Sequence, residues 1–520
     1  MPSPFRKRLI IASLIAAGLV ASARADETAK STRPIETPAE GLIEEGWFIV
    51  EMQGQHCGHM HMTMRRIGDR IESKSIMSIE MARADTKLKI GIEQEYRETL
   101  AGDALGFRQV QTLGEMPSIV SGTIKNGRLK FVEEQAGAKH EKEYPWDAGA
   151  KFAWGQLLEQ RKHGLAPGTE YTLKTYDPSI RPDGAVETAI KVIGKREIDV
   201  LGVKQKLPLV TATLKLGGAT GAAATALPLE LVSDSWLDDD ADPVVTNIDI
   251  GPIKLSVYKS TREKAMATGA PAEMFLQTFV KAKGSIADGA KRVKYRLRLP
   301  PDSKMKLPDL PDTDMQTFKR ISDTEATLDV KRTDWKALKA SKETGIAQPE
   351  YLKASAMVDI NNRRIKRLAT RAASKNAPPI ENADGLRKFV TDYINDKSLG
   401  VGFATATEVA KNRRGDCTEH GVLLAALARA VGIPARGVSG LIEIPAHFGV
   451  KGLQFGYHMW TQVYINGKWV DLDAAMRQTD CAPTHIAISL LPLNDEGIID
   501  SVRSLLPLMG RLEIEILESE

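Results

Sequence analysis

A cysteine, a histidine and an aspartate in the last quarter of the chain have types and spacing suited to thiol chemistry. Cys417 precedes an apolar helical pattern that runs to Val431. Asp416 and Glu419 have the spacing of a capping box, so Cys417 is predicted in the first turn of a helix. The positive end of the helix dipole favours thiolate over thiol at that position. The same helix end offers backbone N–H groups for a developing oxyanion, and the predicted chemistry is nucleophilic attack on a carbonyl.

The histidine and the aspartate, His458 and Asp473, are predicted on the two strands of one hairpin. Asn466-Gly467 is a strong turn signal between two strand-like stretches. With that pair as a two-residue loop, His458 and Asp473 are diagonal neighbours on one face, with Cα atoms roughly 7–8 Å apart. Asp471 shares this face as well. Strand alternation alone therefore leaves two carboxylates as partners for the histidine.

The order of these motifs resembles the transglutaminase-like superfamily. The shared features are Gly-Asp-Cys, a helix ending in Gly-Ile-Pro-Ala-Arg, His-x-Trp on a strand, and Trp-x-x-x-Asp, over residues 400–490. The resemblance implies a papain-like core, in which a helix carrying cysteine packs against a sheet carrying histidine and aspartate. It assigns Cys417 as nucleophile, His458 as base and Asp473 as the carboxylate that orients the base.

Two further details bear on this resemblance. The spacing from Trp469 to Asp473 favours Asp473 over Asp471, and Ala474-Ala475 stands where the family often has Pro and Thr. The later stretch Thr484-His485-Ile486-Ala487 is similar to one that recurs in bacterial members.

The implied reaction is acyl transfer through a thioester, with either water or an amine as the acceptor. Water would make the protein a peptidase or deamidase, and an amine would make it a transglutaminase. The alternative is a cell-envelope binding or scaffold protein that reuses the fold without turnover. His420, one turn after Cys417, is interpreted as a structural residue rather than a rival base. The implied partner is a protein or peptide substrate, and no cofactor is expected.

The N-terminus has the pattern of an export signal. Arg6-Lys7-Arg8 precedes the apolar run Leu9–Val20, and Ala23-Arg24-Ala25 fits a cleavage site after Ala25. The run is short for a membrane span. Residues 1–25 hold four basic and no acidic residues, so the formal charge of +4 becomes 4 − 4 = 0 after cleavage. We expect a periplasmic or secreted protein without the basic excess typical of nucleic-acid binding.

The rest of the chain divides by pattern into four parts. Residues 26–45 are polar and predicted as a tether. Residues 46–264 contain strand-like runs and the hairpin signal Asn126-Gly127, which together predict an antiparallel β domain. Residues 265–335 are predicted as a small β unit or connector with a proline-rich boundary. Residues 336–520 then form the α+β transglutaminase-like domain, which makes the protein multidomain.

A histidine- and methionine-rich stretch and the odd number of cysteines leave further alternatives. His59 and His61 share one strand face and are candidate copper or zinc ligands. The bland alternative is a hairpin whose methionines face the core. Cys57 and Cys481 could form a disulfide in an oxidising compartment, and their positions in the sequence do not decide it.

Overall fold

Strands and helices are assigned over most of the chain in the computed structural model, which divides into an N-terminal unit ending at Glu273 and a C-terminal unit, Met274–Glu520. The predicted signal segment, 1–25, lies outside the described residues, as does the tether up to residue 36. The structure describes residues 37–83, 86–113, 116–135, 138–216, 229–238, 241–250, 253–267, 272–273, 278–300, 306–341, 343, 349–355, 357–397, 404–445, 450–493, 505 and 508–520.

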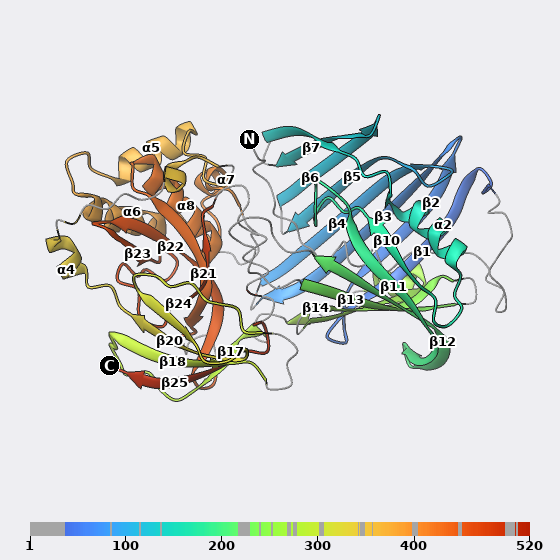
Figure 1. Cartoon of the computed structure of the whole chain (residues 1–520). Helices are drawn as coiled ribbons and strands as arrows, with labels where there is room; N and C mark the ends of the chain where they lie inside the picture. The colour runs from blue at the N-terminus through green and yellow to red at the C-terminus, as the bar shows by residue number, and fades with distance from the viewer. Residues whose placement is uncertain are drawn as a thin grey trace. The chain divides into compact units, whose positions relative to one another are not determined.

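One large meandering sheet makes up the N-terminal unit, and Figure 1 shows its long strands side by side in blue and green. Its order is β8-β7-β6-β5-β4-β3-β2-β1-β15-β14-β13-β12-β11-β10-β9, with β16 beside β3. Its strands are β1 (Gly41–Met52), β2 (Gln55–Ile67), β3 (Arg70–Arg83), β4 (Thr86–Thr99), β5 (Ala104–Leu113), β6 (Met116–Lys125), β7 (Arg128–Gln135), β8 (Ala138–Pro145), β9 (Ala150–Lys151), β10 (Glu170–Thr175), β11 (Val186–Val200), β12 (Val203–Leu216), β13 (Leu229–Leu237), β14 (Pro243–Ile250), β15 (Ile253–Ser260) and β16 (Ala272–Glu273).

Antiparallel pairing dominates this sheet, which confirms the predicted fold class. The β9–β10 and β3–β16 pairs are parallel exceptions. The predicted hairpin signal is confirmed, because Asn126 and Gly127 both have positive φ (52° and 68°) between β6 and β7. The predicted tether ran to residue 45, whereas β1 already begins at Gly41. The described part of this unit also contains the helices α2 (Ala153–His163) and α3 (Arg262–Met266).

The C-terminal unit holds a second sheet, in the order β19-β20-β18-β25-β17-β22-β21-β24, with β23 beside β22. Its strands are β17 (Val280–Lys283), β18 (Arg292–Arg298), β19 (Gln316–Arg320), β20 (Glu325–Lys331), β21 (Ala435–Glu443), β22 (Gln454–Ile465), β23 (Lys468–Leu472), β24 (Ile486–Leu491) and β25 (Glu513–Ser519). Its helices are α4 (Trp335–Ala340), η2 (Pro349–Leu352), α5 (Arg363–Ala372), α6 (Pro379–Tyr393), α7 (Ala406–Asn412) and α8 (Cys417–Ala430).

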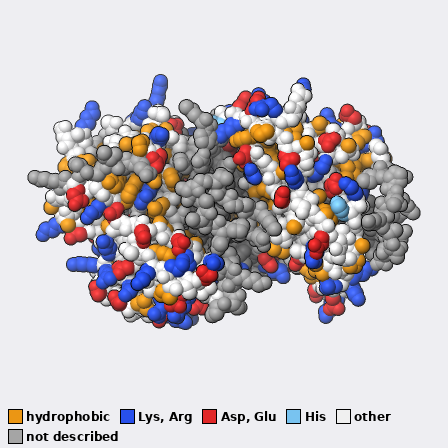
Figure 2. Space-filling view, in the orientation of Figure 1, with side chains coloured by type: hydrophobic (Ala, Val, Ile, Leu, Met, Phe, Trp, Pro, Cys, Tyr) orange, Lys and Arg blue, Asp and Glu red, His pale blue; other side chains and the backbone are white. Residues whose placement is uncertain are grey.

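The segment predicted as a small β unit or connector, 265–335, contributes strands to the C-terminal sheet. Its strands β17, β18, β19 and β20 belong to the C-terminal sheet, and β18 pairs with β25 from the far end of the chain. Arg292–Arg298 does alternate as predicted, with its apolar side chains buried. Its basic side chains pair with acidic ones on β20 and β25, and Figure 2 shows such charges intermingled on the surface. The boundary differs because this pairing is long-range and leaves no local signal.

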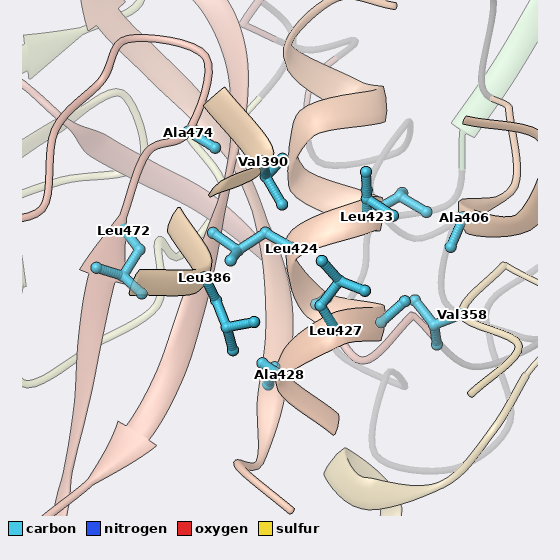
Figure 3. Close-up of a cluster of buried hydrophobic side chains, with 14 of the residues drawn as sticks. Val358, Leu386, Val390, Ala406, Leu423, Leu424, Leu427, Ala428, Leu472 and Ala474 are labelled. Atoms are coloured by element: carbon cyan, nitrogen blue, oxygen red, sulfur yellow. The ribbon is translucent and has the colours of Figure 1, made fainter. Parts of the chain in front are cut away.

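Helix α8 lies at the centre of the C-terminal unit. It is buried from Glu419 to Arg429 and contacts β21 and β22 as well as α5, α6 and α7. In Figure 3, leucines of α8 lie among apolar side chains from several other segments. Helix α8 is buried on all sides through its aliphatic side chains. This packing fixes the direction of the helix and therefore the position of its first residue. The core residues labelled there are Val358, Leu386, Val390, Ala406, Leu423, Leu424, Leu427, Ala428, Leu472 and Ala474.

Candidate active site

The first turn of α8 has the cap that the sequence predicts. Asp416 Oδ1 accepts the N–H of Thr418 at 2.9 Å, and Glu419 Oε2 accepts the N–H of Asp416 at 3.0 Å. Asp416 also accepts from the backbone of Glu419, which completes a capping box. Cys417 is therefore the first residue of the helix, and its side chain is partly buried there.

Glycine is required just before this cap. Gly415 has φ of +152°, and a Cβ built on it would lie 2.2 Å from Cβ of Glu419. Any larger residue would displace the side chain that folds back over the helix end. The Gly-Asp-Cys motif thus has a physical reason, since the glycine makes room for the glutamate of the capping box.

The cap also decides which backbone N–H groups remain for chemistry. The carboxylate of Asp416 takes the N–H groups of Thr418 and Glu419, so it does not leave the whole helix end free. The N–H of Cys417 itself is the one in this turn that the capping box does not take. It is therefore the natural candidate donor to an oxyanion formed on the Cys417 sulfur.

The β22–β23 hairpin has the predicted register. Ile465 opposes Lys468, and the loop residues Asn466 and Gly467 have φ of 51° and 79°. Both loop residues lie in the left-handed region, as a tight two-residue hairpin turn requires. The turn chemistry thus sets which side chains of the two strands share a face.

His458 and Asp473 are brought together by this hairpin. His458 Nε2 lies 2.7 Å from Asp473 Oδ2, and both side chains are buried. Since a carboxylate only accepts, the Nε2 of His458 carries the proton. The remaining ring nitrogen, Nδ1, is the one available to Cys417, whose side chain lies close enough to raise the pKa of His458. Cys417, His458 and Asp473 therefore lie in a row, with His458 in the middle.

The electrostatics of these residues favour a protonated His458 beside an ionised Asp473. Burial lowers the pKa of His458, but the Asp473 carboxylate and Cys417 outweigh it and raise that pKa well above its ordinary value. Burial raises the pKa of Asp473, yet His458 and His485 bring it well below its usual range. Asp473 is thus ionised, and the protonated form of His458 is stabilised.

The two candidate carboxylates have different partners. Asp471 Oδ1 accepts from Trp460 Nε1 at 2.7 Å and from Gln462 Nε2 at 2.8 Å. Burial raises the pKa of Asp471. Asp473 is the carboxylate in contact with His458. Strand alternation leaves both carboxylates open, and hydrogen bonding separates them.

A second histidine reaches the same carboxylate. His485 Nε2 lies 3.0 Å from Asp473 Oδ2, and the other oxygen, Oδ1, accepts the N–H of Met476 at 2.8 Å. On sequence alone, the stretch around His485 stands out only by its similarity to bacterial relatives and receives no role. The signal in the sequence that could have indicated a role for His485 is its position shortly after Asp473. Its contact with Asp473, however, depends on the path of the loop between them.

His420 is turned to the backbone of its own helix. Its Nδ1 lies 2.6 Å from the carbonyl oxygen of Asp416, and burial lowers its pKa. This contact fits the structural interpretation of His420 better than that of a rival base for Cys417.

The other candidate residues have contacts of their own. His61 Nε2 bonds Glu45 Oε1 at 2.8 Å and stacks on Trp47, and the ring of His59 is tilted over the same tryptophan. Within the described ranges, no group of three or more His, Cys, Asp or Glu side chains could hold a metal ion. Cys57, Cys417 and Cys481 are all free thiols, so Cys57 and Cys481 form no disulfide here.

A helix that delivers cysteine to histidine and aspartate on a sheet defines a papain-like arrangement. Residues 366–474 match the family model of the transglutaminase-like superfamily, which confirms the predicted family. This part of the chain is a transglutaminase-like domain. No curated protein matches the chain.

Solved structures with remote similarity include a "Putative Cysteine Protease" from Cytophaga hutchinsonii. It has 15% identity and a TM-score of 0.29, with 45% of this chain and 89% of that chain covered. A beta-barrel-like protein of a domain of unknown function from Brucella abortus has 10% identity and a TM-score of 0.31, with coverages of 43% and 98%. These values are too low to carry an argument about activity.

A third match is a "putative protease" from Parabacteroides distasonis, with 12% identity and a TM-score of 0.18. It covers 69% of this chain and 64% of that chain. Among the described residues, no helix is long and apolar enough to cross a membrane.

Proposed function

We propose that the protein is an exported, thiol-dependent acyl-transfer enzyme that acts on protein or peptide amides. The observation that carries this proposal is the position of His458. It lies between Cys417, at the capped start of α8, and the buried, ionised carboxylate of Asp473. Export, to the periplasm or the medium, is supported by the basic and apolar pattern of residues 1–25.

The proposed reaction begins with transfer of the Cys417 proton to Nδ1 of His458. The sulfur then attacks the amide carbonyl carbon, and the oxyanion is held by the N–H of Cys417. As the C–N bond breaks, His458 gives its proton to the leaving amine, and a thioester remains on Cys417. Asp473 holds the imidazole through Nε2 and stabilises its charged form throughout.

The thioester is resolved by an acceptor that His458 deprotonates. Water gives an acid and returns the free thiol, as in a peptidase or deamidase. A primary amine gives a new amide, as in a transglutaminase. Both outcomes use the same three residues, so the site supports the thioester and leaves the acceptor to experiment.

The test incubates the purified protein with a glutamine-containing peptide, with and without a primary amine, and identifies the products by mass spectrometry. We expect cleavage or deamidation without the amine, or an amine adduct with it, and none of these with Cys417→Ala. Cys57→Ala is the matched control, since Cys57 is buried and lies in the other unit.

Labelling by iodoacetamide supplies an independent readout. Cys57 and Cys481 are both buried, so labelling of the folded protein reports on Cys417. We expect Cys417 to react faster than a free cysteine near pH 6, where free thiols are mostly protonated. A Cys417 that reacts no faster, together with no product from the wild type, would support the scaffold alternative instead.

A further inference from the structure

Two imidazoles share one oxygen of Asp473. The Nε2 atoms of His458 and His485 lie 2.7 Å and 3.0 Å from Oδ2. The N–H of Met476 lies 2.8 Å from Oδ1. The Asp473 side chain is only 1% exposed, so these donors stand in for the water that a carboxylate normally binds.

His485 is itself held firmly in place. Its side chain is 3% exposed, and its ring meets the ring of Trp460 edge to face, with centroids 5.1 Å apart. Its backbone N–H donates to the carbonyl oxygen of Ala482 at 3.1 Å. A side chain fixed by packing and backbone contacts can in turn fix the group that it touches.

The segment around His485 is anchored from β18 and β19. Tyr295 Oη donates to the carbonyl oxygen of Pro483 at 2.8 Å. Gln316 donates to the carbonyl oxygen of Ala487 at 2.9 Å and accepts its N–H at 2.8 Å. The segment predicted as a connector thus sets the position of the second histidine.

We infer that His485 is a positioning residue, which holds the Asp473 carboxylate in line with His458 for the reaction of Cys417. The inference rests on the proposed function. His485 is in contact with Asp473 and would act on Cys417 only through that carboxylate and His458. The family match ends at residue 474, before His485 is reached.

The consequence of losing this donor follows from the charges. Without the Nε2–H of His485, the buried carboxylate loses one of its three donors and is free to turn away from His458. A weaker bond from Asp473 to His458 makes the protonated imidazole less stable. The thiolate–imidazolium pair should then exist over a narrower range of pH.

Other titratable groups face this cluster from the elements around it. They are His420 on α8, Asp471 on β23, and Cys481, the last two buried near Asp473 and His485. Lys397, Asp416, Asp480, Arg332 and Arg436 interact with these groups from further out. These groups are present in every variant, and the imidazole of His485 is absent from all three variants. A difference in the pH profile between the variants with and without a donor at position 485 therefore reports on that donor.

The experiment measures the rate of iodoacetamide alkylation of Cys417 between pH 4 and 10 in the full chain and three variants. His485→Gln keeps a donor without the ring, His485→Met has similar length without a donor, and His485→Phe keeps the ring without a donor. We expect His485→Gln to match the wild type. In His485→Met and His485→Phe, the alkaline end of the reactive plateau should move down by about one pH unit.

Two outcomes overturn the inference. Either the Met and Phe variants keep the wild-type plateau, or the plateau narrows in Gln and Met but not in Phe, which assigns the effect to ring packing. Thermal unfolding identifies a variant that does not fold. If His485→Phe does not fold, the comparison of His485→Gln with His485→Met tests the inference. If both His485→Gln and His485→Met do not fold, His485→Phe tests it: a narrower plateau supports the inference, and a wild-type plateau overturns it.

The wild type separates this inference from the proposed function. If wild-type Cys417 shows no reactive plateau at low pH, or if His458→Gln leaves the plateau in place, the proposed triad fails before any His485 variant is considered. If the plateau is present and depends on His458 but not on the donor at position 485, only the role of His485 fails.

Discussion

Asp471 and Asp473 show how much the surroundings of a residue decide its chemistry. They lie two residues apart at the end of one hairpin strand, and both are buried. Donors from Trp460 and Gln462 occupy Asp471, whereas two imidazoles meet Asp473. Only the second carboxylate can orient a base, so the two aspartates should respond differently to the same substitution.

Asp473→Asn should lower kcat by about 10³- to 10⁴-fold with little change in KM, by analogy with loss of the aspartate in a serine triad. The Asn side chain has one oxygen that can accept a hydrogen bond, whereas the carboxylate has two. Its NH2 group donates, so it favours the tautomer of His458 in which Nε2 carries no proton. Steady-state kinetics on the peptide amide checks this.

Asp471→Asn is the matched control for that prediction. Its Oδ1 can still accept from Trp460 and Gln462, so kcat should stay within a few-fold of wild type. Equal losses of kcat in the two variants would mean that the hairpin as a whole, rather than the contact to His458, is what activity requires.

Sequence predicts the contact between His458 and Asp473 but not the one between His485 and Asp473. Hairpin parity placed His458 and Asp473 on one face, because the Asn466-Gly467 turn and the strand period are local properties. The contact between His485 and Asp473 depends on the path of the loop between them. That path is set by Tyr295, far away in the chain, and no local pattern contains it.

At the scale of elements, the start of α8 was predictable in full because every part of it is local. The glycine, the capping box and the first-turn cysteine all lie between Gly415 and Glu419. The position of Cys417 is therefore set by how the side chains fit at the start of the helix, and not by helix propensity.

Gly415→Ala should therefore lower the free energy of unfolding by roughly 3 kcal/mol and slow alkylation of Cys417. The new Cβ would collide with the side chain of Glu419 and break the capping box. Chemical denaturation of the C-terminal unit and the alkylation rate are the measurements.

Gly432→Ala, at the other end of α8, is the comparison. Gly432 has φ of +82°, and no described residue has an atom within 4 Å of the Cβ that alanine would add. Only backbone strain of about 1–2 kcal/mol is therefore expected. Cys417 of this variant should react as in the wild type. If Gly432→Ala is the more harmful of the two, the clash with Glu419 is not what requires glycine at 415.

Helix α2 in the N-terminal unit gives a prediction for pH. Glu98 accepts the N–H groups of Trp154 and Gly155, each at 2.8 Å, and burial raises its pKa from 4.5 to about 7. Between these values the folded unit binds a proton that the unfolded chain has lost. Its stability therefore falls as pH rises from 4.5 to about 7, and this fall should be shallower in Glu98→Gln.

Hydrogen exchange of the Trp154 and Gly155 amides, corrected for the intrinsic rate at each pH, measures this slope. Some slope should remain, because the pKa of Glu44 in the same unit is also raised to about 7. Glu159→Gln, on a partly exposed position of the same helix, is the control and should leave the slope as it is. A wild-type slope in Glu98→Gln would assign the effect elsewhere.

For the whole molecule, sequence patterns predicted the fold class but not where the C-terminal unit begins. The β-rich first half and the α+β last third follow from periods of two and 3.6 residues, which are local. The segment 265–335 looked separate because its partners are far away in sequence. Strand β18 pairs with β25 at the end of the chain, for example Tyr295 with Ile516.

This pairing predicts which fragments of the C-terminal unit can fold. A fragment of residues 336–520 lacks β17 to β20, so β25 would lose both of its neighbours and expose buried Ile514. It would also lose Tyr295 and Gln316, which hold the segment carrying His485. We expect this fragment to aggregate or to lack cooperative unfolding, because unpaired strand edges and an open apolar face favour association.

The longer fragment, residues 274–520, should fold and alkylate at Cys417 at the rate of the full chain. It keeps the whole second sheet, the apolar core around α8, and the apolar cluster that contains Tyr295 and Phe455. Circular dichroism during thermal unfolding and the pH profile of alkylation compare the two fragments. The prediction is contradicted if residues 336–520 unfold cooperatively and alkylate with the pH profile of the full chain. That result would show that the segment before residue 336 is a connector and that the C-terminal unit does not need it.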